Sequence, residues 1–160
     1  HMLEQTFRDY EGVTFIRPGY YYSNWMHYLD LVREHGILPT SFPPELAIGM
    51  IAPEDVAKFA ADAIAGRYGQ RIYEISGPYY SSRDVADIFG NYLGREVAPV
   101  QTSRDQWEES LLNTGFSVDA AQKFAQMTGA VVDGLTGAEF PDEVIIAETG
   151  LMTYLETING

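Results

Sequence analysis

The stretch Val13-Thr14-Phe15-Ile16-Arg17-Pro18-Gly19-Tyr20-Tyr21-Tyr22-Ser23-Asn24 decides the fold class of this chain. It opens with a short apolar run, residues 13–16, which is typical of a strand buried on both faces. Arg17-Pro18-Gly19 ends this strand, and the spacing of apolar residues then predicts a helix from about Ser23 to His35. The apolar stripe of that helix consists of Trp25, Leu29 and Val32, and Gly36 is placed to stop it. A buried strand that leads into a helix is the repeating unit of an α/β protein.

The same alternation continues toward the middle of the chain. Strands are predicted at 48–51 and 71–75, and an edge strand at 96–100, where Pro99 cannot donate to a central ladder. Helices are predicted after Pro53 and after Ser81, and Gly66 and Gly94 are placed to end them. The buried face of the first of these helices is expected to consist of Val56, Phe59, Ala60, Ala63 and Ile64. A proline-rich loop is expected over 37–47, and Tyr79-Tyr80 is expected in a turn.

The C-terminal third is predicted to be mainly helical. Helices are expected after a capping box at 103–106, after Ser117, and over 151–158. The apolar residues of the first two helices are Trp107 and Leu111, then Ala121, Phe124 and Met127. We therefore expect an α/β fold with a few-stranded, partly parallel sheet and a helical C-terminal tail. We expect a single domain over 1–160, with an α/β part at 3–100 and a helical part at 101–160, and residues 1–2 resemble an expression-tag remnant.

Composition and charge exclude several classes of function. The 160 residues carry a formal net charge of −13, which repels nucleic-acid phosphates and anionic membranes. The chain has no cysteine, which excludes thiolate chemistry and is compatible with a cytoplasmic protein. No apolar run approaches the length of a membrane span. No Lys or Arg follows Lys123, so this acidic region would suit a basic partner, although a solvated acidic surface is the simpler interpretation.

The motifs of several enzyme classes are missing from the sequence. A dinucleotide site needs a Gly-x-Gly-x-x-Gly turn that places pyrophosphate on a helix N-terminus, and no such cluster occurs. No Tyr-x-x-x-Lys pair occurs either, because the lysines are Lys58 and Lys123 alone. With three His and no Cys, we expect no metal site. The sequence therefore predicts no nucleotide-binding half and no self-sufficient NAD(P)-dependent oxidoreductase.

A cluster of aromatic and polar side chains follows the first strand directly. Its members are Tyr20, Tyr21, Tyr22, Asn24, Trp25, His27 and Tyr28. In open α/β sheets, ligands bind beyond the carboxyl ends of the strands, and aromatic walls with a few polar groups suit a small organic ligand. Packing explains Trp25 and Tyr28, whereas Asn24 and His27 lie off the apolar stripe. No catalytic residue is assigned; His27 and Tyr22 are the candidates for acid–base chemistry.

Three further features have a functional and a structural interpretation. Glu54-Asp55 would place carboxylates at a site or stabilise the helix dipole, and we favour the dipole. Arg17 would anchor an anion or form an ion pair with a buried carboxylate, and we favour the ion pair. Tyr79-Tyr80 would contact a ligand or pack, and we favour packing.

Read together, these segments resemble NmrA-like atypical short-chain dehydrogenases. The segment 13–24 resembles their T-x-x-R-P-x-x-F-x-x-N motif, and 50–57 resembles i-x-x-x-D-v-A. Residues 73–82 resemble y-x-l-t-G-p-e-x-x-s, and 93–97 resemble l-G-r-x-v. The closing t-G-x-x-p-x-t is matched by Thr149, Gly150 and Thr153, although Met152 replaces the proline. The resemblance covers nearly all of the chain and is to the C-terminal, substrate-binding half only.

The resemblance implies a fold that is truncated relative to a full Rossmann fold. The family comprises NAD(P)H-dependent quinone and isoflavone-type reductases and non-catalytic redox-sensing regulators. The resemblance implies that Pro18, Gly19 and Tyr20 lie near the nicotinamide, with Pro18 and Gly19 contacting the cofactor only if a front half is supplied. It further implies that Tyr22, Asn24 and the loop around Phe42 lie near the substrate, and we expect Tyr20 and Tyr21 to contact the substrate as well. NAD(P) is implied for the full-length family and no cofactor for this chain alone.

Three hypotheses about function remain open. In the first, the chain is the substrate-binding half of a reductase and needs a complementing Rossmann half or a homodimer to cover open sheet edges. In the second, it is a cofactor-independent enzyme of the cyclase, isomerase or lyase type that uses the aromatic pocket for a small organic ligand. In the third, it is a non-catalytic module that recognises a small molecule or a protein.

Overall fold

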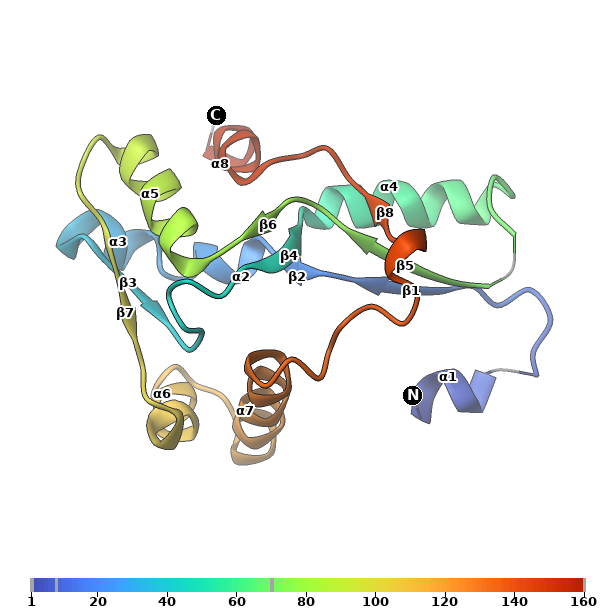
Figure 1. Ribbon diagram of the computed structural model, residues 1–160, viewed down its shortest axis with the longest axis horizontal. Coiled ribbons are helices and arrows are strands. Elements are labelled where there is room, and N and C mark those ends of the chain that lie inside the picture. Colours follow the sequence, from blue (N-terminus) through green and yellow to red (C-terminus); the bar gives the residue numbers. More distant parts are fainter. Residues whose placement is uncertain (1, 8, 70, 160) are drawn as a thin grey trace. The chain divides into compact units, whose positions relative to one another are not determined.

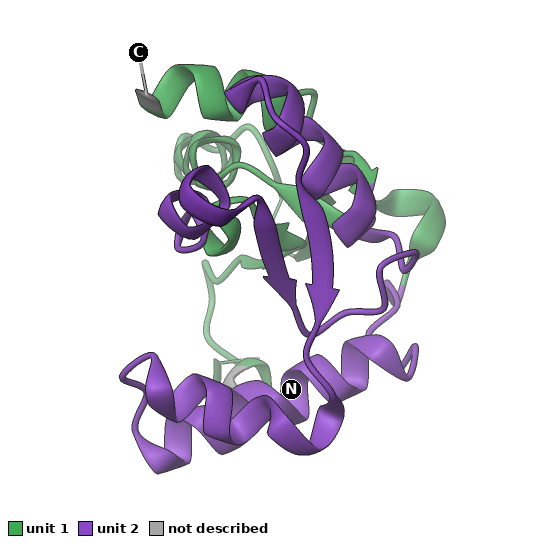
Figure 2. Cartoon of the chain, turned by 90° about the vertical axis from the view of Figure 1, so that its left-hand side faces the viewer, with its two compact units in different colours: residues 1–25, 49–79, 140–160 green, residues 26–48, 80–139 purple. Residues whose placement is uncertain are grey.

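The computed structural model describes residues 2–7, 9–69 and 71–159 (Figure 1). The chain forms two compact units that interleave along the sequence (Figure 2). Unit 1 comprises residues 1–25, 49–79 and 140–160, and unit 2 comprises 26–48 and 80–139. Strand β7 (Ala98–Gln101) and the helices after it lie in the same unit, so the change of sequence character near residue 100 is not a boundary between units.

Unit 1 is built on a parallel sheet of three strands. These are β1 (Phe15–Pro18), β5 (Ile72–Ser76) and β8 (Ile145–Ile146), in the order β1-β5-β8. Ile16 is paired with Tyr73 and Arg17 with Glu74. The first two strands lie within two residues of the predicted ranges, which is the usual uncertainty at element ends. The α/β class predicted from the alternation of strands and helices is thereby confirmed.

One face of this sheet is covered by helix α4 (Pro53–Ile64), which runs along β1 and β5 (Figure 1). The core between them contains the buried residues Ile51, Phe59, Tyr73 and Ile75. The predicted buried face of α4 was wrong at Ile64, whose side chain is 89% exposed. Ile64 lies five residues after Phe59, and at 100° per residue this turns it by about 140° away from the core.

A second set of short strands carries the aromatic segment. Strands β2 (Tyr20–Tyr21), β4 (Ile48–Ile51) and β6 (Tyr79–Tyr80) lie in that order, with β2 parallel to β4. Tyr79-Tyr80 is therefore a strand and not the predicted turn. The reason is the pairing of this segment with β4: the Gly77 amide donates to the Met50 carbonyl at 2.8 Å, and the Met50 amide donates to the Pro78 carbonyl at 3.1 Å.

The single helix predicted over 23–35 is two helices. They are α2 (Ser23–Met26) and α3 (Leu29–His35), separated by His27 and Tyr28. The chain passes from unit 1 to unit 2 after Trp25, so the two halves of the apolar stripe are anchored in different units. The predicted stop at Gly36 is confirmed, since this residue has φ of 67° and its amide bonds to the Val32 carbonyl.

Unit 2 contains a two-stranded parallel sheet, β3 (Ile37–Thr40) with β7. The predicted loop at 37–47 was wrong over its first four residues. Leu38 and Thr40 are buried and alternate with Ile37 and Pro39, which is the pattern of a strand. Helix α5 (Ser82–Leu93) has the predicted N-terminus: Ser81 and Asp84 form a capping box, and hydrogen bonds from the Ser81 side chain and amide lower the pKa of Asp84.

Prolines lie at both free edges of this two-stranded sheet. The Ala98 amide donates to the Gly36 carbonyl and the Thr102 amide to the Thr40 carbonyl. Because backbone groups alternate in direction along a parallel ladder, Pro39 and Pro99 are turned to the outer edges. Because proline has no amide hydrogen, it cannot donate a hydrogen bond to a further strand, and both edges therefore pair poorly with another chain.

The remaining elements are mainly helical, as predicted. Helix α6 (Trp107–Asn113) follows a 3₁₀ turn, η1 (Arg104–Gln106), and precedes α7 (Val118–Val132). In place of the predicted capping box, the Ser103 hydroxyl donates to Gln106 Oε1 at 2.8 Å. Unit 1 also includes α1 (Met2–Phe7), the turn η2 (Pro141–Glu143) and the C-terminal α8 (Leu151–Asn159). Among the described helices, none has the length and apolar character needed to cross a membrane.

Candidate functional site

The residues at the end of β1 and in β2 form the candidate ligand segment of unit 1. The Tyr20 ring meets the Trp25 ring edge-on, with centroids 5.8 Å apart. Trp25 is buried, and its Nε1 donates to the Met50 sulfur at 3.3 Å. Tyr20 and Tyr21 are half-buried. The rings of Tyr20 and Trp25 are thus held next to β4 by the contact between Trp25 and Met50.

Tyr22 is fixed more firmly than its neighbours. Its side chain is 0% exposed, and its hydroxyl donates to the Thr149 carbonyl at 3.0 Å. Its ring lies 5.5 Å from that of Tyr154 in α8. Burial and the Glu54 carboxylate raise the pKa of Tyr154 above its ordinary value. Tyr22 therefore connects the end of β2 to α8 and the residues just before it. These contacts suit a residue that positions the aromatic segment rather than one that contacts a ligand.

Asn24 offers a polar group in the same segment. Its side chain is half-buried, and within the described part of the chain its amide makes no hydrogen bond. Gly19 lies just before this segment, and a Cβ added there would lie 2.7 Å from the Gly49 carbonyl oxygen and 3.1 Å from Ser76 Oγ. Only glycine fits where the end of β1 approaches β4 and β5 so closely.

Two of the predicted site residues belong to unit 2. His27 is exposed in the turn between α2 and α3. Phe42 is only 4% exposed, and its amide donates to Thr40 Oγ1 at 3.0 Å. Thr40 Oγ1 in turn lies 2.8 Å from Ser82 Oγ. The buried hydroxyl groups of Thr40 and Ser82 thus join the start of the 41–47 segment to the start of α5. No motif in the sequence indicated this pair.

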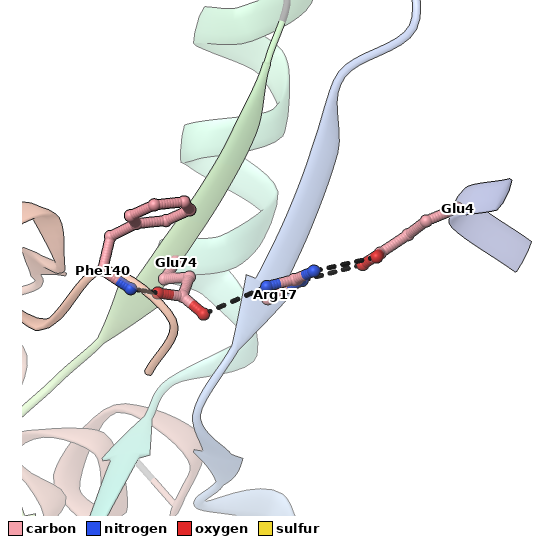
Figure 3. A network of polar contacts seen from close by, with 4 residues as sticks. All are labelled: Glu4, Arg17, Glu74 and Phe140. Atoms are coloured by element: carbon pink, nitrogen blue, oxygen red, sulfur yellow. Dashed lines mark hydrogen bonds and ion pairs between the residues drawn. The ribbon is translucent and has the colours of Figure 1, made fainter. Parts of the chain in front are cut away.

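A polar network on β1 and β5 decides between the two interpretations of Arg17 (Figure 3). The Nε and Nη2 atoms of Arg17 donate to the Glu4 carboxylate at 2.7 and 2.8 Å, and Nη1 donates to Glu74 Oε1 at 3.3 Å. Glu74 Oε2 accepts the Phe140 amide at 3.1 Å. The ion-pair interpretation is therefore confirmed.

The start of α4 contains a buried carboxylate oxygen. Asp55 Oδ2 is inaccessible to solvent and, among the described residues, has no hydrogen-bond partner. Asp55 occupies the third position of its helix, as Asp84 does in α5, but its N-cap is Ala52, which has no hydroxyl. In α5 the N-cap Ser81 donates its hydroxyl to Asp84 Oδ2 at 2.6 Å. At α4 the acidic residue of a capping box is thus present, but the N-cap hydroxyl that would complete the box is missing.

We expect Ala52→Ser to stabilise the protein by about 0.5 to 1 kcal/mol, because its hydroxyl would complete the box and give Asp55 Oδ2 a donor. Urea unfolding followed by circular dichroism measures the change. Ala52→Ser in an Asp55→Ala background is the control; the gain should be smaller there, because the hydroxyl can still accept the backbone amide of residue 55 but has no carboxylate to donate to. A destabilised Ala52→Ser variant would show that the buried N-cap has no room for the hydroxyl.

Within the part of the chain that the structure describes, no three His, Asp or Glu side chains are grouped to hold a metal ion. No protein-family model matches the sequence, and no curated protein matches it either.

The structure is similar to those of a quinone oxidoreductase, a triphenylmethane reductase and a nucleoside-diphosphate-sugar epimerase. An NADPH-dependent quinone oxidoreductase from Escherichia coli matches all of this chain and 60% of its own, with 19% identity and a TM-score of 0.71. The triphenylmethane reductase of a Citrobacter species, solved with NADP(H), matches 90% of this chain and 52% of its own, with 19% identity and a TM-score of 0.70. A Staphylococcus aureus nucleoside-diphosphate-sugar epimerase matches 89% and 51%, with 22% identity and a TM-score of 0.69.

This chain therefore spans little more than half the length of its structural neighbours. The fold that the NmrA-like resemblance implied is confirmed.

Proposed function

We propose that this chain is the substrate-binding part of an NAD(P)-dependent reductase whose nucleotide is bound by residues outside 1–160. The observation that carries the proposal is the likeness of nearly the whole chain to 60% of an NADPH-dependent quinone oxidoreductase and 52% of a triphenylmethane reductase solved with NADP(H). The missing phosphate-binding glycine turn supports it. The small organic substrate would be held by Tyr20, Tyr21 and Asn24, and Tyr22 would hold this segment in place through Thr149.

The described residues do not fit a dinucleotide by themselves. The turn at Gly19 leads into β2 and not into a helix, so it presents no helix N-terminus to a pyrophosphate. Of a bound dinucleotide, this chain would contact only the nicotinamide end, through Pro18 and Gly19. His27 stays a candidate for acid–base chemistry and Phe42 a candidate substrate contact, and both belong to unit 2. No step of hydride transfer follows from these residues alone.

We predict that the isolated chain does not bind NADPH with useful affinity. Most of the binding energy of a dinucleotide comes from the glycine turn, the helix N-terminus and the ribose-reading residue. A net charge of −13 also disfavours a phosphate-bearing ligand. Isothermal titration with NADPH is the measurement, and the E. coli quinone oxidoreductase serves as the positive control.

A dissociation constant for NADPH in the low micromolar range or below would contradict the proposal, because the chain would then contain a nucleotide site of its own. The reading frame upstream of residue 1 provides an independent test. A glycine-rich βαβ segment encoded there would support the proposal.

A further inference from the structure

The sequence contains a single Asp-Gly pair, Asp133-Gly134, and this pair lies at the end of helix α7. An aspartate followed by glycine isomerises more easily than other aspartates, because no side chain shields the glycine nitrogen. That nitrogen attacks the carboxyl carbon Cγ, the C–OH bond breaks, and the amide proton leaves with the hydroxyl as water. Addition of water to either carbonyl of the resulting succinimide gives aspartate or isoaspartate, so the reaction needs no other reagent.

The Asp133-Gly134 pair is open to solvent. The Asp133 side chain is 43% exposed, and a Cβ added at Gly134 would meet no atom within 4 Å. Gly134 has φ of 71°, a conformation that glycine adopts without strain and other residues rarely adopt. Water therefore reaches the site, and the backbone favours the residue that makes isomerisation easiest.

The backbone at Asp133 is held in a conformation that opposes the attack. Its ψ is 2°, so the Gly134 nitrogen eclipses the Asp133 nitrogen and is turned away from the side chain. The Gly134 amide donates to the Val131 carbonyl at 3.0 Å, and the Asp133 amide donates to the Gly129 carbonyl at 2.9 Å. Both hydrogen bonds lie at a helix end, where local opening costs least. The backbone alone is therefore a weak barrier.

Arg104 holds the side chain of Asp133. Its Nη1 donates to Oδ1 at 3.0 Å and its Nη2 donates to Oδ2 at 2.8 Å, and two such bonds fix the orientation of a carboxylate. Hydrogen bonds from Arg104 also lower the pKa of Asp133. The ionised carboxylate resists attack by a nitrogen, whereas the neutral carboxyl group can lose its hydroxyl as water. Arg104 therefore opposes the reaction by geometry and by charge.

The space for Arg104 is provided by a glycine of α7. A Cβ added at Gly129 would lie 2.5 Å from Arg104 Nη2. Gly129 lies about one helical turn before Asp133, so the guanidinium crosses α7 at the glycine and reaches the carboxylate. The guanidinium also lies 5.5 Å from the centroid of the Trp107 ring, and Trp107 is buried. Contacts to α6 and α7 thus place Arg104 on Asp133.

We propose that Asp133-Gly134 is a latent isomerisation site, and that Arg104 keeps it closed. Loss of the ion pair lets isoaspartate form at residue 133. The product has a main chain that is longer by a methylene group at the end of α7, and its free carboxylate is attached to Cα. Arg104 then loses its two-bond partner, so the change does not reverse when the ion pair is restored. The proposal does not depend on the proposed function.

Peptide mapping by mass spectrometry, with electron-transfer fragmentation to separate isoaspartate from aspartate, tests the proposal on the full chain at slightly acidic pH. We expect Arg104→Met to isomerise at residue 133 about threefold to fivefold faster than the wild type, the effect of losing one exposed ion pair. The wild type unfolded in urea should react faster than either folded protein. Arg83→Met is the matched control, because Arg83 pairs with Glu45 elsewhere in unit 2 and is also exposed. It should react at the wild-type rate.

Two further variants make the test specific. Asp133→Glu added to Arg104→Met should abolish the product at residue 133, because glutamate cannot close a five-membered ring. If circular dichroism shows that Arg104→Met does not fold, Gly129→Ala takes its place, since the added Cβ would displace the guanidinium without removing its charge. A variant that isomerises no faster than the folded wild type would overturn the proposal. A folded wild type that isomerises as fast as the chain in urea would also overturn it.

Discussion

Replacing Tyr22 by alanine is expected to lower the free energy of unfolding by about 3 to 5 kcal/mol, the range found for large aromatic residues in cores. The Tyr22 side chain is 0% exposed and its ring packs against Tyr154, so its removal leaves a cavity between β2 and α8. The Thr149 carbonyl also loses its donor. Urea unfolding followed by circular dichroism gives the change in free energy.

Tyr22→Phe separates the ring from the hydroxyl. It keeps the packing and removes the hydrogen bond to Thr149, so we expect a loss of about 1 kcal/mol. Tyr79→Ala is the matched surface control, since Tyr79 is 63% exposed, and it should cost much less than Tyr22→Ala. Equal effects of Tyr22→Ala and Tyr79→Ala would contradict the burial described here.

Replacing Arg17 by methionine is expected to cost about 2 to 3 kcal/mol, because the carboxylates of Glu4 and Glu74 would lose their shared cation. The three side chains are mostly buried, with exposed fractions of 23%, 17% and 13% for Arg17, Glu4 and Glu74. The remaining like charges would repel each other with little solvent to screen them. Thermal unfolding and urea unfolding measure the loss.

Arg71→Met is the matched control for this network. Arg71 pairs with Glu143 at 3.1 Å, but the two side chains are 57% and 60% exposed. It also lies over the Tyr73 ring, 4.7 Å from the centroid. Exposed pairs contribute about 0 to 1 kcal/mol, so we expect a loss of about 1 kcal/mol or less. If Arg17→Met and Arg71→Met lowered the free energy of unfolding equally, the conclusion that the buried Arg17 network stabilises the protein more than an exposed ion pair would be wrong.

Local signals in the sequence predicted most of the elements. Apolar runs located β1, β4 and β5, and the capping residue Ser81 with Gly94 located both ends of α5. These signals succeed because burial and capping depend on residues that are close in sequence. The strand β3 was missed because its proline suggested a loop, and the sequence does not reveal that this segment pairs with β7 in a sheet of two strands, where Pro39 lies at an edge.

The candidate site was predicted less completely than the fold. The aromatic segment after β1 follows from its position, but the bond between Tyr22 and Thr149 joins residues 127 positions apart and no local pattern indicates it. The same holds for the hydroxyl pair of Thr40 and Ser82. The ligand roles of Tyr20, Tyr21, Asn24, His27 and Phe42 stay predictions.

The interleaving of the two units has a consequence for the order in which the protein can fold during synthesis. Residues 26–48 and 80–139 complete unit 2 before β8 and α8 have been made. Unit 1 needs residues 140–160 to add its third strand and the helix on which Tyr22 packs. Its first two strands are therefore made before the third strand, β8, is available to pair with β5. Unit 1 is therefore the part that is completed last, and its partly formed state is the one at risk of misassembly.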